Sequence, residues 1–220
     1  MQWLYKKGNE TKMINELISR YPSLASCRGD IEAAIAAIIE CYEKGGKVLL
    51  CGNGGSCADC DHIVGELMKG FLKSRRLDGY KKKEMMGRCP ALDDSLLSEL
   101  QGGLPAISLA SFTALNTAFC NDENPELIYA QALLGLAKEN DILIAISTSG
   151  GAKNVNAAAK VALGLGMKVI SLTGEKGGTL AELATIAIKA PETETFKVQE
   201  LHLPIYHCLC ACVEEHFFKI

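Results

Sequence analysis

The sequence predicts an α/β protein: a three-layer α/β/α sandwich around a five-stranded parallel sheet, with a helical N-terminal prelude and a long C-terminal helix. Two observations support this. Five short apolar runs are separated by segments of helical periodicity. The chain of 220 residues, 48% hydrophobic and 22% charged, has an ordinary globular composition. We therefore expect one domain over residues 1–220.

Charge and hydropathy exclude several classes of partner. A net charge of −3 creates no field that would gather nucleic acid or an anionic membrane surface. No apolar run approaches the roughly 20 residues of a membrane span, and the N-terminus lacks the apolar core of a signal peptide. We expect a cytoplasmic protein with a small-molecule partner, no nucleic acid and no membrane.

The ten cysteines are interpreted as core residues. Cys57 and Cys60 form a C-x-x-C, but no second pair stands at the spacing of a zinc finger. A reduced cytosolic protein uses cysteine as a small apolar packing residue.

Two amphipathic helices are expected in residues 1–44. The first covers residues 9–21 and ends at Pro22, and Asp30 is expected to cap the second, which Gly45 and Gly46 close. The apolar face of each helix must pack against another surface. Another subunit and the chain's own sheet are equally plausible as that surface.

The most informative unit comes next: a strand at 47–51, a glycine-rich turn at 52–56 and a helix at 58–68. Glycines let backbone N–H groups approach an anion, and the helix start favours one. His62 and Glu66 are four residues apart and share a face of the helix. Nucleotide, metal and catalytic interpretations are all open at this point.

Residues 72–103 are the least regular stretch and read as an insertion or flap. Basic residues outnumber acidic ones in its first half. One short basic run in an acidic chain favours a solvated flap over a nucleic-acid site, and a loop of this length beside a site is a candidate lid.

The remaining chain alternates strands and helices. Strands are expected at 106–111, 141–147, 168–172 and 185–189, and helices at 113–119, 126–137, 155–163, 179–183 and 195–218, with a polar turn at 121–122. Ligands of parallel sheets bind beyond the carboxyl ends of the strands. This selects the loops 52–56, 147–154 and 173–178.

The loop at 147–154 is a better candidate for the phosphate-binding site than the turn at 52–56. It presents Ser147, Thr148 and Ser149, followed by glycines, before a helix. It lacks the spacing of a P-loop, and the turn at 52–56 lacks the dinucleotide fingerprint, so neither nucleotide interpretation is favoured.

Polar residues interrupt the apolar C-terminal helix, and each could simply be a hydrogen-bonded core residue. They are Gln199, Glu200, His202 and His207. Together with His62 and Glu66 they supply the groups needed for proton transfer or for zinc.

Five motifs resemble the sugar isomerase (SIS) domain family, of the phosphoheptose isomerase type, over most of the chain. They are CGNGGSCADCDHIVGEL at 51–67, ND at 121–122, ISTSG at 146–150 with KNV at 153–155, SLTGEKGG at 171–178 and VQELHLPIYH at 198–207. The resemblance implies a cytoplasmic homotetramer with sites between subunits, which converts sedoheptulose 7-phosphate into a D-glycero-D-manno-heptose 7-phosphate.

The resemblance also implies roles for individual residues. Glu66 and His207 match the proton-transfer pair. The positions that match zinc ligands are His62, Glu66, Gln199 and His207. The expected substrate contacts are Asn53, Gly54, Gly55, Ser56, Asn121, Asp122, Ser147, Thr148, Ser149 and Gln199.

Three departures from the family pattern concern the substrate. Ala152 replaces a hydroxyl donor of the phosphate loop, Phe196 replaces a substrate-contacting Asp, and the insertion at 72–103 is longer than usual. They keep two alternatives open: another SIS phosphosugar enzyme, such as an amino-sugar isomerase or an etherase-type lyase, and a non-catalytic SIS regulator that binds a phosphosugar or a protein.

Helix geometry raises a question about the zinc set. Gln199 and His207 are eight residues apart, which is about 12 Å along a straight helix and about 80° around it. The helix starts after Gln199, or Pro204 bends it, or the two side chains come from different subunits.

Overall fold

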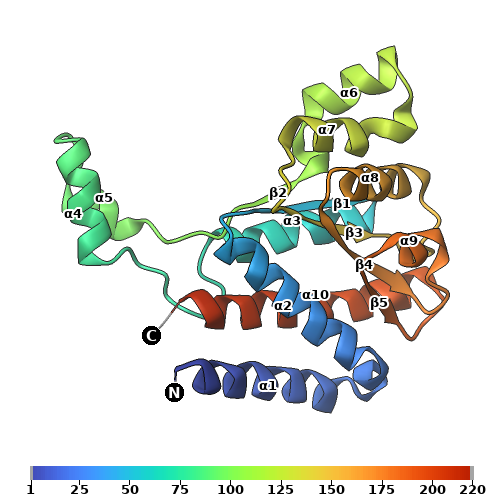
Figure 1. Cartoon of the computed structure of the whole chain (residues 1–220), viewed down its shortest axis with the longest axis horizontal. Coiled ribbons are helices and arrows are strands. Elements are labelled where there is room, and N and C mark those ends of the chain that lie inside the picture. Colours follow the sequence, from blue (N-terminus) through green and yellow to red (C-terminus); the bar gives the residue numbers. More distant parts are fainter. Residues whose placement is uncertain (1, 219–220) are drawn as a thin grey trace.

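The computed structural model describes residues 2–218, with side chains from residue 8 on. In this part of the chain five strands form one sheet in the order β2-β1-β3-β4-β5, with every neighbouring pair parallel (Figure 1). The strands are β1 (Val48–Gly52), β2 (Ala106–Ser108), β3 (Ile142–Ile146), β4 (Lys168–Gly174) and β5 (Ile186–Ala190). The predicted parallel sheet is confirmed. Only β2 is clearly shorter than expected, because a 3-10 turn, Leu109–Ser111, follows it directly.

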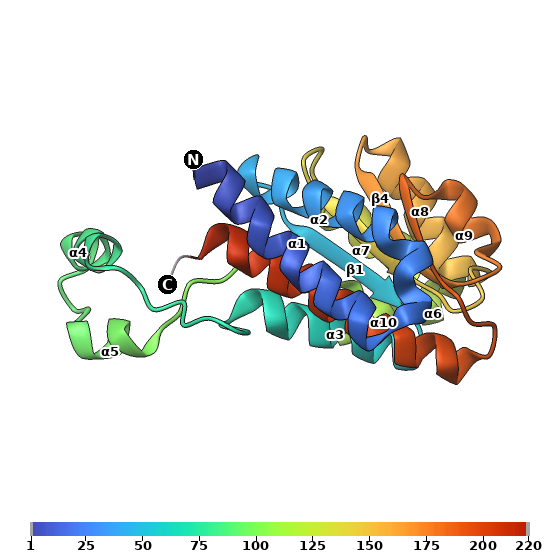
Figure 2. The same cartoon turned by 90° about the horizontal axis from the view of Figure 1, so that it is seen from below.

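Successive strand residues point to opposite faces of the sheet, and each face has its own core. Leu50, Ile144 and Leu172 pack toward α2 (Arg28–Glu43), α3 (Gly55–Met68) and α10 (Thr195–Phe217). Leu49 and Leu143 pack toward α7 (Ile128–Leu136), α8 (Lys153–Gly164) and α9 (Gly178–Leu183). The three-layer sandwich is therefore confirmed (Figure 2).

The N-terminal helices cover the chain's own core. α1 (Gln2–Arg20) runs along α10 and buries Ile14 and Leu17, while α2 lies over the sheet (Figure 2). The prediction that Asp30 caps the second helix is wrong. A 3-10 turn, Pro22–Cys27, leads straight into α2, so Cys27 stands at the N-cap and Asp30 lies in the first turn.

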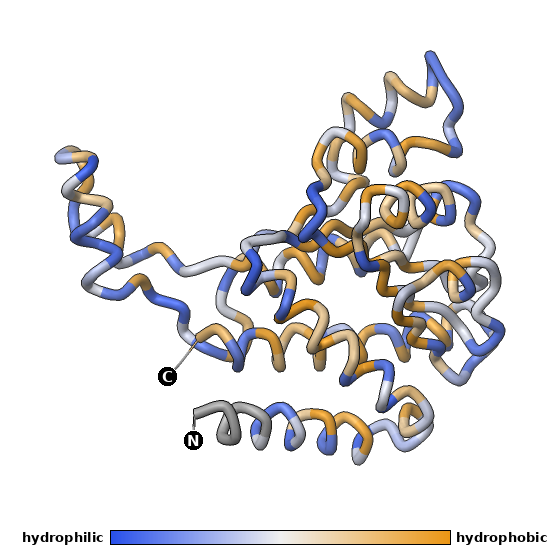
Figure 3. Tube along the Cα trace, viewed as in Figure 1, coloured by the Kyte–Doolittle hydropathy of each residue, from blue (hydrophilic) through white to orange (hydrophobic). Residues whose placement is uncertain are grey.

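The insertion carries two helices, α4 (Gly79–Arg88) and α5 (Asp94–Glu99), where the sequence predicts irregular backbone. They project from the sandwich as an arm (Figure 1). α4 buries none of its residues and α5 buries only Leu97, and the hydropathy trace of the arm is largely hydrophilic (Figure 3). Capping side chains Asp78 and Asp93 start the two helices.

The basic run of the arm is paired within the arm itself. Lys81 and Arg88 both contact Glu84, and Lys82 contacts Asp94. These ion pairs neutralise much of the charge that a nucleic-acid partner would need.

Two further predictions concern the turn at 121–122 and the cysteines. Asn121 and Asp122 form the last turn of α6 (Thr113–Asp122), a helix with no buried residue, rather than a separate turn. All ten cysteines are free and seven are buried, as expected for core residues, but the interpretation is wrong for Cys89 and Cys120, which are exposed, and Cys57 is only partly buried. Within the described residues, every helix is too short or too polar to cross a membrane.

Candidate active site

The site forms along α3 and α10, which lie side by side. α3 starts at the carboxyl end of β1 and ends beside the start of β2, where the N–H of Leu104 donates to the carbonyl of Leu67. Along both helices the contacts come in the same order: Gly55 meets Gln199, and seven residues later His62 meets Tyr206 and His207. The two helices therefore run in the same direction. α10 is continuous through Pro204, so Gln199 and His207 belong to one helix.

The glycine turn places the start of α3 close to α10. Gly54 has φ +56°, a conformation that favours glycine, and a Cβ on Gly55 would collide with the side-chain amide of Gln199. Ser56 is buried at the helix start, and its N–H donates to the carbonyl of Asn53. These residues set the distance between the turn and α10.

Asn53 is held by a neighbour from another strand end. Its amide exchanges two hydrogen bonds with Asn154 of α8, at 2.8 and 2.9 Å. The hydroxyl of Tyr129 donates to the carbonyl of Gly52 at 2.6 Å and also lies 3.2 Å from Oδ1 of Asn53. The turn after β1 is thus tied to the helix after β3.

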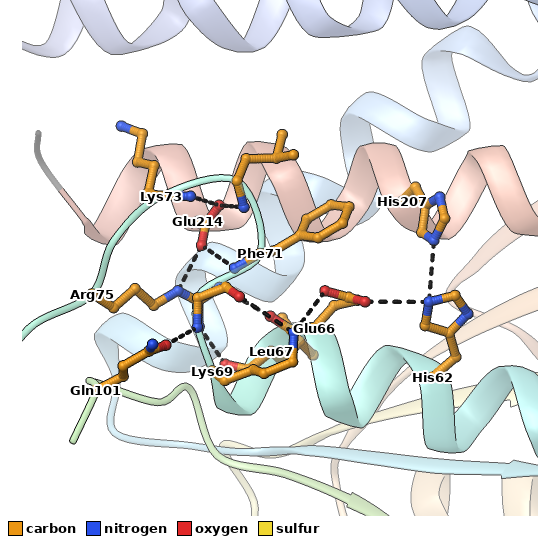
Figure 4. A network of polar contacts seen from close by, with 12 residues as sticks. His62, Glu66, Leu67, Lys69, Phe71, Lys73, Arg75, Gln101, His207 and Glu214 are labelled. Atoms are coloured by element: carbon orange, nitrogen blue, oxygen red, sulfur yellow. Dashed lines mark hydrogen bonds and ion pairs between the residues drawn. The ribbon is translucent and has the colours of Figure 1, made fainter. Parts of the chain in front are cut away.

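Three of the predicted catalytic and metal residues come together. Nε2 of His62 lies 3.2 Å from Oε1 of Glu66 and 3.4 Å from Nε2 of His207 (Figure 4). The Glu66 side chain is 13% exposed, and its Oε2 is buried without a hydrogen-bond partner, with the Lys69 ammonium 3.7 Å away. A buried carboxylate oxygen without a donor is available to take a proton.

His207 has an environment that favours the neutral imidazole. Burial, with the neighbouring His62 as a further cause, lowers its pKa below the ordinary value. A neutral imidazole can accept a proton and return it, which is the property needed in the second acid/base group.

The spacing of these donors matches part of a zinc site. With zinc–ligand bonds of about 2.0–2.1 Å, neighbouring donors of a tetrahedral site lie about 3.3–3.4 Å apart. The two contacts of His62 have that length. Gln199 lies against Gly55, two helical turns before His62, and does not join them within this chain. Across the described residues, no group of three or more His, Cys, Asp or Glu is arranged to hold a metal ion.

The loop at 147–154 is a compact turn with one exposed hydroxyl. Ser147 is buried, Ser149 is exposed, and Gly150 has φ +66°. A Cβ on Gly150 would collide with the carbonyl of Gly177, and the carbonyl of Gly150 accepts from Leu180 N at 3.0 Å. The loops after β3 and β4 are therefore packed together.

Two departures from the family pattern, Ala152 and Phe196, and the expected substrate contacts Asn121 and Asp122 are partly or fully exposed. Ala152 stands at the N-cap of α8, which has no side-chain cap bond. Phe196 begins α10 with 56% of its surface exposed, and the Lys197 ammonium lies over its ring. Asn121 and Asp122 are exposed and hydrogen-bonded to each other at 2.9 Å.

A cleft of about 430 Å³ opens beside His207. It lies between α1, α10 and the base of the arm, and its lining includes Arg20, Tyr21, Phe71 and Leu72. The Phe71 ring is 5.4 Å from the His207 ring, centroid to centroid. This cleft gives a molecule outside the protein access to the histidine.

Sequence reasoning missed several residues around the cluster. Tyr206 contacts Nδ1 of His62, the nitrogen that does not face Glu66, and its hydroxyl also donates to Asp59; Asn154 holds Asn53. Asp59 stands three residues before His62, a helical spacing visible in the sequence. Nothing in the local pattern pairs Tyr206 or Asn154 with their partners.

Comparisons with known proteins show the family of this chain. The SIS domain family matches residues 117–209 and also residues 13–87. A phosphoheptose isomerase from Helicobacter pylori (strain P12) is 36% identical over 89% of this chain and 88% of its own. One from Geotalea daltonii is 36% identical over 94% and 98% of the two chains.

Solved structures show the same likeness. A phosphoheptose isomerase from Francisella tularensis superposes with a TM-score of 0.72 at 30% identity, covering 97% of this chain and 98% of the other. Another, from Neisseria gonorrhoeae, has a TM-score of 0.69 at 26% identity and covers 97% of both chains.

Proposed function

This chain belongs to the SIS domain family, among its phosphoheptose isomerases, and from that premise we propose how it acts on its substrate. It is a phosphosugar isomerase that interconverts sedoheptulose 7-phosphate and a D-glycero-D-manno-heptose 7-phosphate. The observation that supports the mechanism is the cluster of Glu66, His62 and His207 beside an open cleft.

The reaction moves one proton between two adjacent carbons. Glu66 takes the proton from C1 of the open-chain ketose while His207, which enters this step as the imidazolium, supplies a proton to the C2 oxygen; this gives an enediol and a neutral His207. His207 then removes the proton of the C1 hydroxyl, and Glu66 returns its proton to C2, which gives the aldose. Every proton removed is returned, so the enzyme ends in its starting state.

The substrate is held at its far end by the loop after β3. The hydroxyl of Ser149 and the backbone N–H groups at the start of α8 favour a phosphate there, and the helix N-terminus adds its positive end. Asn53, fixed by Asn154, presents its amide on the neighbouring turn for the sugar hydroxyls.

Zn²⁺ is proposed as the metal of this site, with His62, Glu66 and His207 as its holders in one protomer. Bound there, the ion would polarise the carbonyl and stabilise negative charge on the enediolate. The separations of 3.2 and 3.4 Å support this choice, while Gln199 would have to come from a second subunit.

We also propose a cytoplasmic homotetramer with sites between subunits. The exposed arm and α6 support an assembly, because both leave apolar side chains uncovered, among them Leu96, Leu100 and Leu115.

The test is proton exchange in deuterated water. A panel of ketose and aldose phosphates is incubated with the enzyme, with and without added zinc, and deuterium at C1 or C2 is followed by NMR. Sedoheptulose 7-phosphate is expected to exchange fastest. Exchange of another phosphosugar alone would assign a different SIS substrate, which Phe196 and Ala152 would then explain, and no exchange in any sample would refute the isomerase.

A further inference from the structure

A buried hydroxyl stands directly behind the catalytic cluster. Tyr206 is 1% exposed, and its hydroxyl lies 3.0 Å from Nδ1 of His62 and 3.2 Å from Oδ1 of Asp59. The opposite nitrogen of the same imidazole, Nε2, faces Glu66 and His207. The His62 imidazole thus lies between the reacting groups, Glu66 and His207, and the pair formed by Tyr206 and Asp59.

The hydroxyl has a single proton and two neighbours that compete for it. An ionised carboxylate only accepts hydrogen bonds, so the pair with Asp59 requires Tyr206 to donate. The Tyr206 oxygen then accepts from His62, which requires a proton on Nδ1. A phenol has an ordinary pKa of about 10, so Tyr206 carries its proton at neutral pH.

The opposite arrangement leaves a buried acceptor unsatisfied. If Tyr206 donated to Nδ1, Asp59 would lose this donor, and its Oδ2 is already buried without a partner. A half-buried carboxylate with no donor is unfavourable, because the loss of hydration is not compensated by a hydrogen bond. The imidazolium of His62 satisfies both carboxylates, because it donates to the Tyr206 oxygen and to Glu66. In the neutral Nδ1–H form Glu66 loses this donor but keeps the Lys69 ammonium 3.7 Å away, whereas Asp59 forms no ion pair among the described residues.

We infer that Tyr206 and Asp59 are positioning residues that hold the proton of His62 on Nδ1, so that Nε2 is the nitrogen that exchanges protons or binds a cation in the cleft. Neither residue needs to touch the substrate. The consequence for catalysis rests on the proposed function, whereas the position of the proton does not.

The experiment measures the ring nitrogens of His62 directly. Two-bond ¹⁵N–¹H correlation spectra are recorded on protein freed of metal by a chelator, and the His62 signals, among four histidines, are assigned with His62→Gln. The wild type is expected to show a protonated Nδ1 and, in alkaline buffer, an unprotonated Nε2. Tyr206→Phe and Asp59→Ala should each move the proton to Nε2, where Glu66 accepts it.

Matched controls remove the same groups elsewhere. Tyr42→Phe deletes a hydroxyl that bonds to the carbonyl of Pro105, and Asp61→Ala deletes a carboxylate on the same helix as Asp59. Both should leave the His62 spectrum unchanged. A wild type with the proton on Nε2, or unaltered His62 signals in both Tyr206→Phe and Asp59→Ala, would overturn the inference.

Turnover provides an independent readout. Loss of a partner that orients an active-site histidine typically lowers activity or metal affinity about 10- to 100-fold. Tyr206→Phe is expected to lower kcat by that factor with KM unchanged, because the hydroxyl faces away from the cleft. If the tautomer changes as expected but no phosphosugar reacts even in the wild type, the inference stands and the proposed function fails.

Discussion

Nε2 of His207 lies 3.4 Å from Nε2 of His62, although 145 residues separate them in the chain. The contact exists because α3 and α10 run side by side in the same direction. It brings His207, the second acid/base group, to the helix that carries Glu66. Gln199, earlier on α10, packs instead against Gly55 at the start of α3.

Glu66→Gln should abolish proton exchange while the fold is kept. The amide has the shape of the carboxylate but cannot take a proton, so exchange at C1 is expected to fall by about 100- to 10,000-fold. NMR in deuterated water measures the rate, and circular dichroism checks the fold. Glu139→Gln, an exposed change in the segment before β3, should exchange at the wild-type rate. Near-normal exchange by Glu66→Gln would assign another base.

Zinc content should depend on the two histidines. His62→Gln and His207→Gln each remove a donor of the proposed set and are expected to lower affinity for added Zn²⁺ by at least about 10-fold. Gln199 packs on Gly55 of its own chain, so it can complete the proposed set only from a second subunit, and Gln199→Ala should then lower zinc affinity in the oligomer. Metal analysis after dialysis and competition with a chelator measure both effects. Unchanged zinc affinity in Gln199→Ala would limit the set to the residues of one protomer.

Gly150 and Gly151 provide a matched pair in the phosphate loop. Gly150→Ala forces a side chain at φ +66° into the carbonyl of Gly177, which should destabilise the loop by about 1–3 kcal/mol and raise KM for the phosphosugar. Gly151→Ala meets only the Ser149 hydroxyl at 3.5 Å, an ordinary contact. Equal KM values for both variants would show that the substrate phosphate binds elsewhere.

The ion pair between Arg75 and Glu214, at the base of the arm, should affect stability more than any other ion pair of the described residues. The Glu214 carboxylate accepts from Arg75 at 2.7 Å and from the backbone N–H groups of residues 71–73 (Figure 4). Both side chains are at most 1% exposed. Glu214→Ala leaves Arg75 buried and unpaired, so unfolding in urea should be easier by about 3–5 kcal/mol.

An exposed pair in the arm is the control for this change. Glu84→Gln breaks contacts with Lys81 and Arg88 at the surface and should alter stability by less than about 1 kcal/mol. Similar losses in both variants would mean that burial does not set the strength of these pairs. Because Arg75 also donates to the carbonyls of Glu66 and Leu67, Glu214→Ala should lower activity as well.

His202 should make the fold sensitive to mild acid. Burial lowers its pKa from 6.5 to about 4, while its Nε2 lies 3.2 Å from the carbonyl of Thr173. Between pH 6.5 and about 4 the unfolded chain binds a proton at His202 that the folded chain does not. The free energy of unfolding therefore falls as the pH decreases, by up to about 1.4 kcal/mol per pH unit. Urea midpoints from pH 7.5 to 4.5 measure the slope. His202→Gln should reduce it, and an unchanged slope would contradict this assignment.

The sequence by itself determined the layers, the sheet and the candidate loops, because these follow from local patterns. Apolar runs of strand length separated by helical periods require a covered parallel sheet, and its carboxyl ends select the loops after β1, β3 and β4. The i, i+4 spacing of His62 and Glu66 was likewise enough to place them together.

Only the tertiary structure decided which distant side chains meet. The packing of α10 against α3 joins His207 and Tyr206 to His62, and Arg75 to Glu214, at separations from 139 to 145 residues. Such pairs depend on the register between helices, which is set by the whole core and leaves no periodic signal in either segment. The arm shows the same limit, since α4 and α5 bury almost nothing that a hydrophobic pattern could reveal.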